Sequence, residues 1–159
     1  MDWTGLVVGA MFGTLLMTTI MEGGQYLRIT RMSLPFLLGT FVTENRTWAN
    51  VWGFVFHFAN GIAFAIGYGL FFEVVNRSDW WVGATAGFLH GLFVLTVVIP
   101  AIPDIHPRMA SEDEGPDSTP MLQPPGFLAL NYGPQTPLMT LAAHAAYGAI
   151  VATFYRPFG

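Results

Sequence analysis

Long apolar runs separated by shorter polar stretches dominate this chain. Each run is close to the ~20 helical residues that cross the hydrocarbon core of a bilayer. The runs extend from Leu6 to about Met21, from about Val51 to Phe72, from Trp80 to Pro100 and from about Pro137 to Tyr155. Because lipid offers no partner to an unpaired backbone group, each run must be helical. The pattern therefore predicts an all-α membrane protein with four transmembrane helices.

The connections between these runs differ in length and character. Residues 76–79 are long enough only for a tight antiparallel turn between the second and third runs. The two long connections each contain a short apolar piece, residues 34–41 and residues 126–132. Both pieces are too short to cross a membrane. We therefore expect them to form interfacial or re-entrant segments.

The two halves of the chain repeat one order of features. Residues 8–15 match residues 82–89 at five of eight positions, and the segment that starts at His57 echoes the one that starts at His144. Each half thus consists of a glycine-rich helix, an apolar loop piece and a histidine-bearing helix. Since each unit has two spans, the halves share one orientation. We predict one transmembrane domain, residues 1–159, built from two parallel hairpin repeats, about 5–75 and 80–156.

The composition agrees with a membrane location and excludes several functions. The chain is 53% hydrophobic and only 10% charged, whereas about a quarter of a typical soluble domain is charged. It has no cysteine, which excludes disulfides, thiolate metal sites, iron–sulfur clusters and covalently attached c-type haem. No basic stripe favours nucleic acid. We expect lipids and other membrane-protein subunits as partners.

The arginines indicate an orientation. Arg28, Arg31, Arg46 and Arg108 lie on the side of the long connections, against two arginines on the opposite side. Positive residues concentrate in cytoplasmic loops, so this excess of two places the long loops in the cytoplasm, beneath what we take to be a bacterial inner membrane. The first apolar run has neither a basic region before it nor a cleavage site after it, and we expect it to remain as an anchor.

Glycines recur at helical spacing in the first and third runs. Small residues four positions apart form a face that lets two helix backbones approach closely, and such faces drive helix association in lipid. The glycines concerned are Gly9, Gly13, Gly83, Gly87 and Gly91. We predict that they form helix–helix contacts, either within the bundle or against a neighbouring protein.

Three histidines lie inside three different runs. Polar side chains are costly there, and an ionisable residue within a membrane span is a candidate functional residue. His57, His90 and His144 lie at depths that differ by roughly one helical turn. They can therefore face a common point inside the bundle.

The residue four positions before each histidine is small and shares its helix face. These clearance positions are Gly53, Ala86 and Thr140. A cleared surface beside an imidazole suits a flat macrocycle, and two histidines on facing helices predict axial ligation of a b-type haem or a chlorin. The alternative is a structural role, in which each imidazole donates a hydrogen bond across a helix interface.

A metal site is a further candidate at the long-loop edge of the membrane. Glu22, Asp104 and His106 lie there, and His57 or His144 would complete a set of oxygen and nitrogen ligands. No HExxH or ExxH spacing places two ligands on one helix face. The segment around Asp104 and His106 fits a polar interfacial loop equally well.

The functional hypotheses follow from these features. No Ser/His/Asp, phosphate-loop or paired-carboxylate arrangement supports hydrolytic or phosphoryl-transfer chemistry. The leading hypothesis is a non-catalytic accessory subunit that stabilises or bridges a larger membrane complex of respiratory or photosynthetic type. The first alternative is a histidine-liganded haem- or pigment-binding electron-transfer subunit. The second is a small oligomeric transporter, although the spans have no carboxylate at mid-depth.

Overall fold

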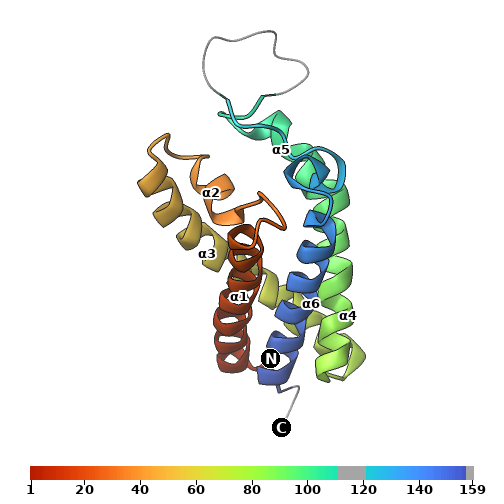
Figure 1. Cartoon of the computed structure of the whole chain (residues 1–159). Helices are drawn as coiled ribbons and strands as arrows, with labels where there is room; N and C mark the ends of the chain where they lie inside the picture. The colour runs from red at the N-terminus through yellow and green to blue at the C-terminus, as the bar shows by residue number, and fades with distance from the viewer. Residues whose placement is uncertain (111–120, 157–159) are drawn as a thin grey trace.

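The computed structural model describes residues 1–110 and 121–156, which are drawn in colour in Figure 1. Its helices, in chain order, are α1 (Trp3–Tyr26), α2 (Leu34–Gly39), α3 (Arg46–Val75), α4 (Trp80–Phe93), the π turn η1 (Val94–Val98), α5 (Ile99–Ile105), the 3-10 segment η2 (Phe127–Tyr132) and α6 (Thr136–Phe154). Within these described residues, four helical stretches are long and apolar enough to cross a membrane: α1, α3, the continuous stretch from α4 to α5, and α6. The predicted all-α class and the four spans are therefore confirmed.

Helix α6 lies at the centre of the bundle. It packs against α1 on one side and α4 on the other, whereas α3 packs mainly on α1 and α2. Figure 1 shows α3 inclined behind the other spans, with α2, α5 and η2 at one end of the molecule and both chain ends at the opposite end. The end that carries α2, α5 and η2 is called the loop end below.

The glycines predicted to form packing faces all lie against α6. A Cβ atom built on Gly83 would lie 2.2 Å from the carbonyl oxygen of Gly148, and one on Gly87 would lie 2.1 Å from that of His144. Gly9, Gly13 and Gly91 lie against Val151, Tyr147 and His144. The contacts are therefore made within the bundle, where the missing side chains let α1 and α4 approach α6 closely.

The third span continues beyond Pro100, where the apolar pattern alone placed its end. Proline lacks a backbone N–H, and its ring collides with the carbonyl group four residues earlier in a regular α-helix. Here the π turn η1 precedes Pro100, and the N–H of Ile99 donates to the carbonyl of Val94, five residues earlier. The wider turn accommodates the proline, so the helical stretch reaches Ile105. Such π turns occur often at functional sites.

The first short apolar piece forms α2, which packs across the start of α3. Ser33 caps α2, because its side chain accepts a hydrogen bond from the N–H of Phe36. Two glycines allow the contact with α3. A Cβ atom on Gly39 would lie 1.6 Å from the carbonyl oxygen of Ala49, and one on Gly53 would lie 1.6 Å from that of Pro35. Helix α2 is thus seated backbone to backbone on α3.

A polar cluster joins the C-terminal ends of α3 and α6, far from the loop end. The buried hydroxyl of Tyr155 donates to Oε1 of Glu73, while Oε2 of Glu73 is buried without a partner among the described residues. Burial and this hydrogen bond raise the pKa of Tyr155 to about 12. The phenol therefore stays protonated and remains a donor at neutral pH.

Replacing Tyr155 by Phe removes one of the two partners of Glu73 Oε1 and leaves the N-terminal ammonium, 3.4 Å away. We expect the free energy of unfolding to fall by about 1.5–3 kcal/mol, the usual contribution of a hydrogen bond to a charged group. Unfolding by a denaturing detergent titrated into a mild one measures this loss. Tyr26→Phe is the matched control, because Tyr26 is 88% exposed. Equal stabilities of the two variants would contradict the role given to this bond.

Candidate functional site

The three histidines of the spans surround one cavity inside the bundle. His57 comes from α3, His90 from α4 and His144 from α6, and the cavity measures about 120 Å³. The ring centroids of His90 and His144 are 5.0 Å apart, edge to face. The further lining residues are Thr14, Met17, Leu34, Leu38, Asn60, Gly61, Phe64, Val94, Val98, Ile99, Ile102 and Tyr147. The π turn η1 therefore supplies part of the wall.

The hydrogen bonds of two imidazoles indicate which nitrogen carries the proton. Nδ1 of His144 lies 2.8 Å from the carbonyl oxygen of Thr140 and must donate to it, so Nε2 is the acceptor of the neutral ring. Nδ1 of His90 lies 3.2 Å from the Tyr68 hydroxyl. No other acceptor for that hydroxyl occurs among the described residues, so Tyr68 donates and Nε2 of His90 carries the hydrogen.

Two polar groups of the cavity have no partner in the described part of the chain. Nε2 of His90 and Oγ1 of Thr14 are buried and form no hydrogen bond. Buried polar groups in proteins are nearly always satisfied by protein, water or a bound molecule. The cavity therefore has unused hydrogen-bonding capacity in an otherwise apolar surrounding.

The cavity reaches the lipid-facing surface between α3 and the third span. Asn60 and Phe64 on α3 line it and are exposed on the outside of the bundle, and so is Val98 on η1. Beside Phe64 it adjoins a shallow groove of about 210 Å³, lined by Phe64, Gly67, Tyr68, Phe71 and Ala86. A molecule dissolved in the bilayer can enter from this side.

His90 and His144 leave no gap between them for the predicted haem or chlorin. A bis-imidazole site needs a flat macrocycle between two rings, but the rings of His90 and His144 are in edge contact. A cavity of about 120 Å³ is also smaller than the roughly 300–1,000 Å³ of sites for drug-sized ligands. Of the clearance positions, Gly53 is filled by Pro35 of α2, Thr140 borders a void of only about 20 Å³, and Ala86 borders the shallow groove.

The predicted metal ligands Glu22, Asp104 and His106 do not come together in the described part of the chain. No group of three His, Cys, Asp or Glu side chains in the described residues is placed to hold a metal ion. Glu22 accepts a hydrogen bond from Ser33, and Asp104 is exposed. His106 packs against α2 instead. These residues were grouped by membrane level alone, and their side chains belong to separate contacts.

The comparisons with known proteins leave the site to be interpreted from its geometry. No family model, curated protein or solved structure matches this chain.

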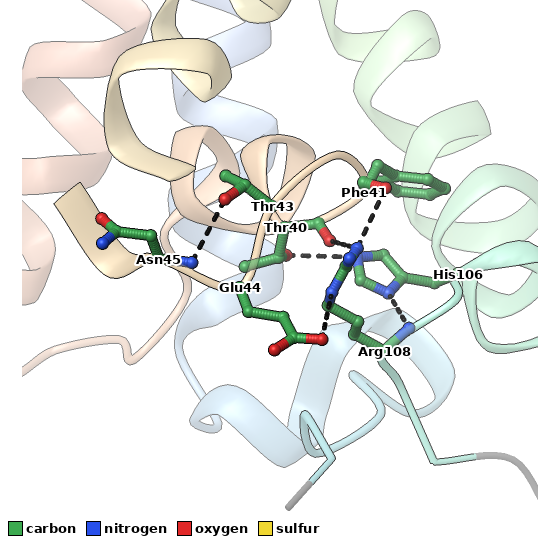
Figure 2. Close-up of polar contacts among 7 residues, drawn as sticks. All are labelled: Thr40, Phe41, Thr43, Glu44, Asn45, His106 and Arg108. Carbon is green, nitrogen blue, oxygen red and sulfur yellow. Dashed lines mark hydrogen bonds and ion pairs between the residues drawn. The ribbon is translucent and has the colours of Figure 1, made fainter. Parts of the chain in front are cut away.

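A second polar cluster, shown in Figure 2, holds the loop after α5 against the end of α2. Nη1 of Arg108 donates to the carbonyl oxygens of Thr40 (2.8 Å) and Phe41 (3.1 Å). Nε2 of His106 donates to the carbonyl oxygen of Leu37, and its Nδ1 accepts from the N–H of Arg108. The carbonyl groups that end α2 are thereby satisfied. This cluster, the α2 latch, fixes one wall of the cavity.

The buried His106 of the α2 latch makes the stability of the protein depend on pH. Burial lowers the pKa of His106 below its usual value, and the nearby Arg108 cation lowers it further. A folded-state pKa below the unfolded value of about 6.5 means that the unfolded chain binds more protons. The stability supplied by His106 is therefore present above pH 6.5 and is lost as the pH falls below it.

We expect the difference in thermal midpoint between the wild type and His106→Gln to shrink between pH 7.5 and pH 5.5. Thermal unfolding in detergent at both pH values measures it. A difference that stays constant or grows toward low pH would show that the latch does not depend on the neutral imidazole.

Sequence reasoning identified the three histidines but not all of the cavity. Phe64, which lines the cavity, and Tyr68, which bonds to His90, were missed, although both lie on the His57 face of α3 at helical spacing. A polar ring in mid-span was the available signal for Tyr68. No sequence pattern indicated that η1 would form part of the cavity wall. The nearest signal was Pro100, which was interpreted as the end of the third span.

Proposed function

We propose that this membrane protein binds the polar ring of a small lipid-soluble molecule that carries carbonyl or hydroxyl oxygens, such as a quinone or a phenol. The observation that supports the proposal is the cavity that opens beside α3 and has unpartnered hydrogen-bonding groups among its lining residues. Its walls are largely apolar, with a few convergent polar groups, as is usual for small-molecule sites. The bound molecule would supply the missing partners.

The two hydrogen-bonded imidazoles match such a ring. A protonated imidazole is costly inside a membrane, so both rings are taken as neutral. Nε2–H of His90 donates to a carbonyl oxygen, and Nε2 of His144 accepts from a hydroxyl. The Phe64 ring, whose centroid lies 4.3 Å from that of His90, offers an aromatic surface at the entrance. One site can thus bind both the carbonyl and the hydroxyl form of a ring.

The size of the cavity limits what enters. About 120 Å³ accommodates a single ring and not a larger fused system. A hydrocarbon tail would leave toward the lipid along the groove of Gly67, Phe71 and Ala86, which is apolar and adjoins the entrance. The preferred ligand is therefore a one-ring head group with an apolar tail.

Equilibrium binding of a short-tailed benzoquinone to the protein in nanodiscs tests the proposal. His90→Phe removes the donor, and we expect affinity to fall about tenfold, the equivalent of one buried hydrogen bond of about 1.4 kcal/mol. Gly67→Leu fills the groove and should weaken binding of tailed ligands more than tailless ones. Thr85→Val is the control, because Thr85 is exposed and bonds only to the carbonyl of Trp81. Undiminished binding by His90→Phe would refute the site.

An accessory subunit of a larger membrane complex is the second candidate, favoured by the exposure of α3. Only 22% of the most apolar 18-residue stretch of α3 is buried, against 50% of the corresponding stretch of α1. Asn60 is exposed in mid-span, where lipid gives an amide no partner. A partner helix would cover this face. A photo-crosslinker at Trp52, exposed on α3, tests this candidate; crosslinks to lipid alone would exclude it.

The internal repeat is part of this proposal. A helix, a short loop-end segment and a histidine helix occur in each half, as α1–α2–α3 and as α4–η2–α6. Gly61 of α3 lies against Thr14 of α1, and Gly148 of α6 lies against Gly83 of α4. In each half, the contact joins the first helix to the histidine-bearing helix. This correspondence supports a duplication. We further propose that the loop end is cytoplasmic, in a bacterial inner membrane.

A further inference from the structure

A second pocket lies at the loop end, apart from the histidine cavity. It measures about 460 Å³ and is lined by Glu22, Gln25, Arg31, Ser33, Phe36, Leu37, Arg46, Asn50, Leu122, Gln123 and Tyr132. Its size is within the usual range for small-molecule sites. Unlike the histidine cavity, it presents charged groups of both signs.

The two arginines of this pocket have no carboxylate partner within the described residues. Nη2 of Arg31 donates to the side-chain oxygen of Gln123 and to the carbonyl of Asn131, which holds the guanidinium in place and leaves its other donors unused. Arg46, the first residue of α3, lies over the ring of Phe36, 5.8 Å from its centroid. Guanidinium groups bind phosphate oxygens through paired donors.

The single carboxylate of the pocket belongs to Glu22. Its Oε1 accepts a hydrogen bond from the Ser33 hydroxyl at 3.0 Å, and no ion pair to Glu22 is formed by any described residue. The carboxylate is half-buried, where a missing cation costs more than it does on an open surface. Among the described residues, the pocket thus combines two cations that have no ion-pair partner with one anion that has none.

The position of the pocket matches the head-group level of a membrane. Its walls come from the last turns of α1, the start of α3 and the loop-end segments. Trp48, two residues after Arg46, is exposed, and tryptophans concentrate at the membrane–water interface. A lipid molecule standing beside α3 would place its head group here.

We propose that this pocket binds the head group of a phospholipid that carries both a phosphate and a primary ammonium group. Arg31 and Arg46 bind the phosphate, and Glu22 accepts hydrogen bonds from the ammonium. An anionic head group without an amine satisfies only the arginines. A quaternary ammonium has no N–H to donate to Glu22. The order of affinity is therefore phosphatidylethanolamine, then phosphatidylglycerol, then phosphatidylcholine.

Native mass spectrometry of the protein released from nanodiscs with equal amounts of these three lipids tests the proposal. We expect phosphatidylethanolamine to be retained most. Arg46→Gln should lower retention of all three lipids about fivefold, the effect of one cation near a membrane surface. Glu22→Gln keeps an acceptor for Ser33 and should abolish the preference for phosphatidylethanolamine over phosphatidylglycerol. Arg28→Gln is the control, because Arg28 lies at the same end outside the pocket.

Two results would overturn the proposal. One is equal retention of the three lipids by the wild type, or unchanged retention by Arg46→Gln when that variant elutes as a single folded species. The other is displacement of the lipid by inorganic phosphate at millimolar concentration, which would identify the free anion as the ligand. Neither result would affect benzoquinone binding at the histidine cavity, because the two pockets share no residue. The two proposals can therefore fail independently.

Discussion

The variant Gly87→Leu is expected to lose the packed bundle. A Cβ atom at this position lies 2.1 Å from the carbonyl oxygen of His144, and a backbone oxygen inside α6 cannot move aside without moving the helix. Overpacking costs typically 1–3 kcal/mol and occasionally more. We expect about 3 kcal/mol or more here, because α4 must separate from the central helix.

Gly67→Leu is the matched control for this prediction. Gly67 also lies in a transmembrane helix, and a Cβ atom built there meets nothing within 4 Å. Leucine has the higher helix propensity, so the control should be neutral or slightly more stable. Detergent-induced unfolding and size-exclusion profiles measure both variants. A folded, monodisperse Gly87→Leu protein would contradict the contact between α4 and α6.

The variant Gly53→Ala is expected to release α2 without unfolding the spans. Even one added carbon would lie 1.6 Å from the carbonyl oxygen of Pro35. Helix α2 is short and joined by loops, so it moves away more readily than α3 does. Its displacement would open the histidine cavity toward the loop end, because Leu34 and Leu38 form part of the wall.

The absence of native cysteine makes this release measurable. A single cysteine replacing Leu37, which is 4% exposed, should react with a water-soluble maleimide about tenfold faster or more in the Gly53→Ala background, if the clash costs at least 1.4 kcal/mol. Gly23→Ala is the control, since Gly23 has no neighbour within 4 Å. Identical labelling rates in the two backgrounds would show that α2 is not seated on α3 through Gly53.

The spans and the glycine faces were predictable because the membrane imposes strong rules. Lipid requires helices of a minimum length, and that length is visible as an apolar run. Glycines spaced by four indicate a close contact wherever they occur in lipid. Sequence alone left open which helix would meet Gly83 and Gly87. The central place of α6 depends on contacts between residues far apart in the chain.

The interior of the site was less predictable. Helical spacing placed His57, His90 and His144 at similar depths, but depth does not give the direction of a side chain around its helix axis. His90 and His144 turned out to touch, which removes the gap a macrocycle needs. The small residue Gly53 was interpreted as clearance, whereas it accommodates α2. A small side chain indicates a close neighbour, and only the tertiary structure identifies that neighbour.

The path of the third span and the α2 latch depended on local backbone details. Pro100 normally ends or kinks a helix, and the compensating π turn leaves no clear pattern in the residues of η1. The sequence predicted His106 and Arg108 on the side of the long connections, and both bond to α2 at the loop end. Their hydrogen bonds to the carbonyl groups of α2 join segments that are far apart in the chain, and no spacing rule relates them.

We propose above that a lipid-soluble, oxygen-bearing ring binds at the histidine cavity. Imidazole nitrogen NMR of the protein in nanodiscs tests it most directly, because each of the four histidines gives its own pair of signals. A short-tailed benzoquinone should shift Nε2 of His90 and Nε2 of His144 in a saturable manner and leave the signals of His106 unchanged. Saturable binding that leaves His90 and His144 unshifted, or shifts all four histidines equally, would contradict binding at this cavity.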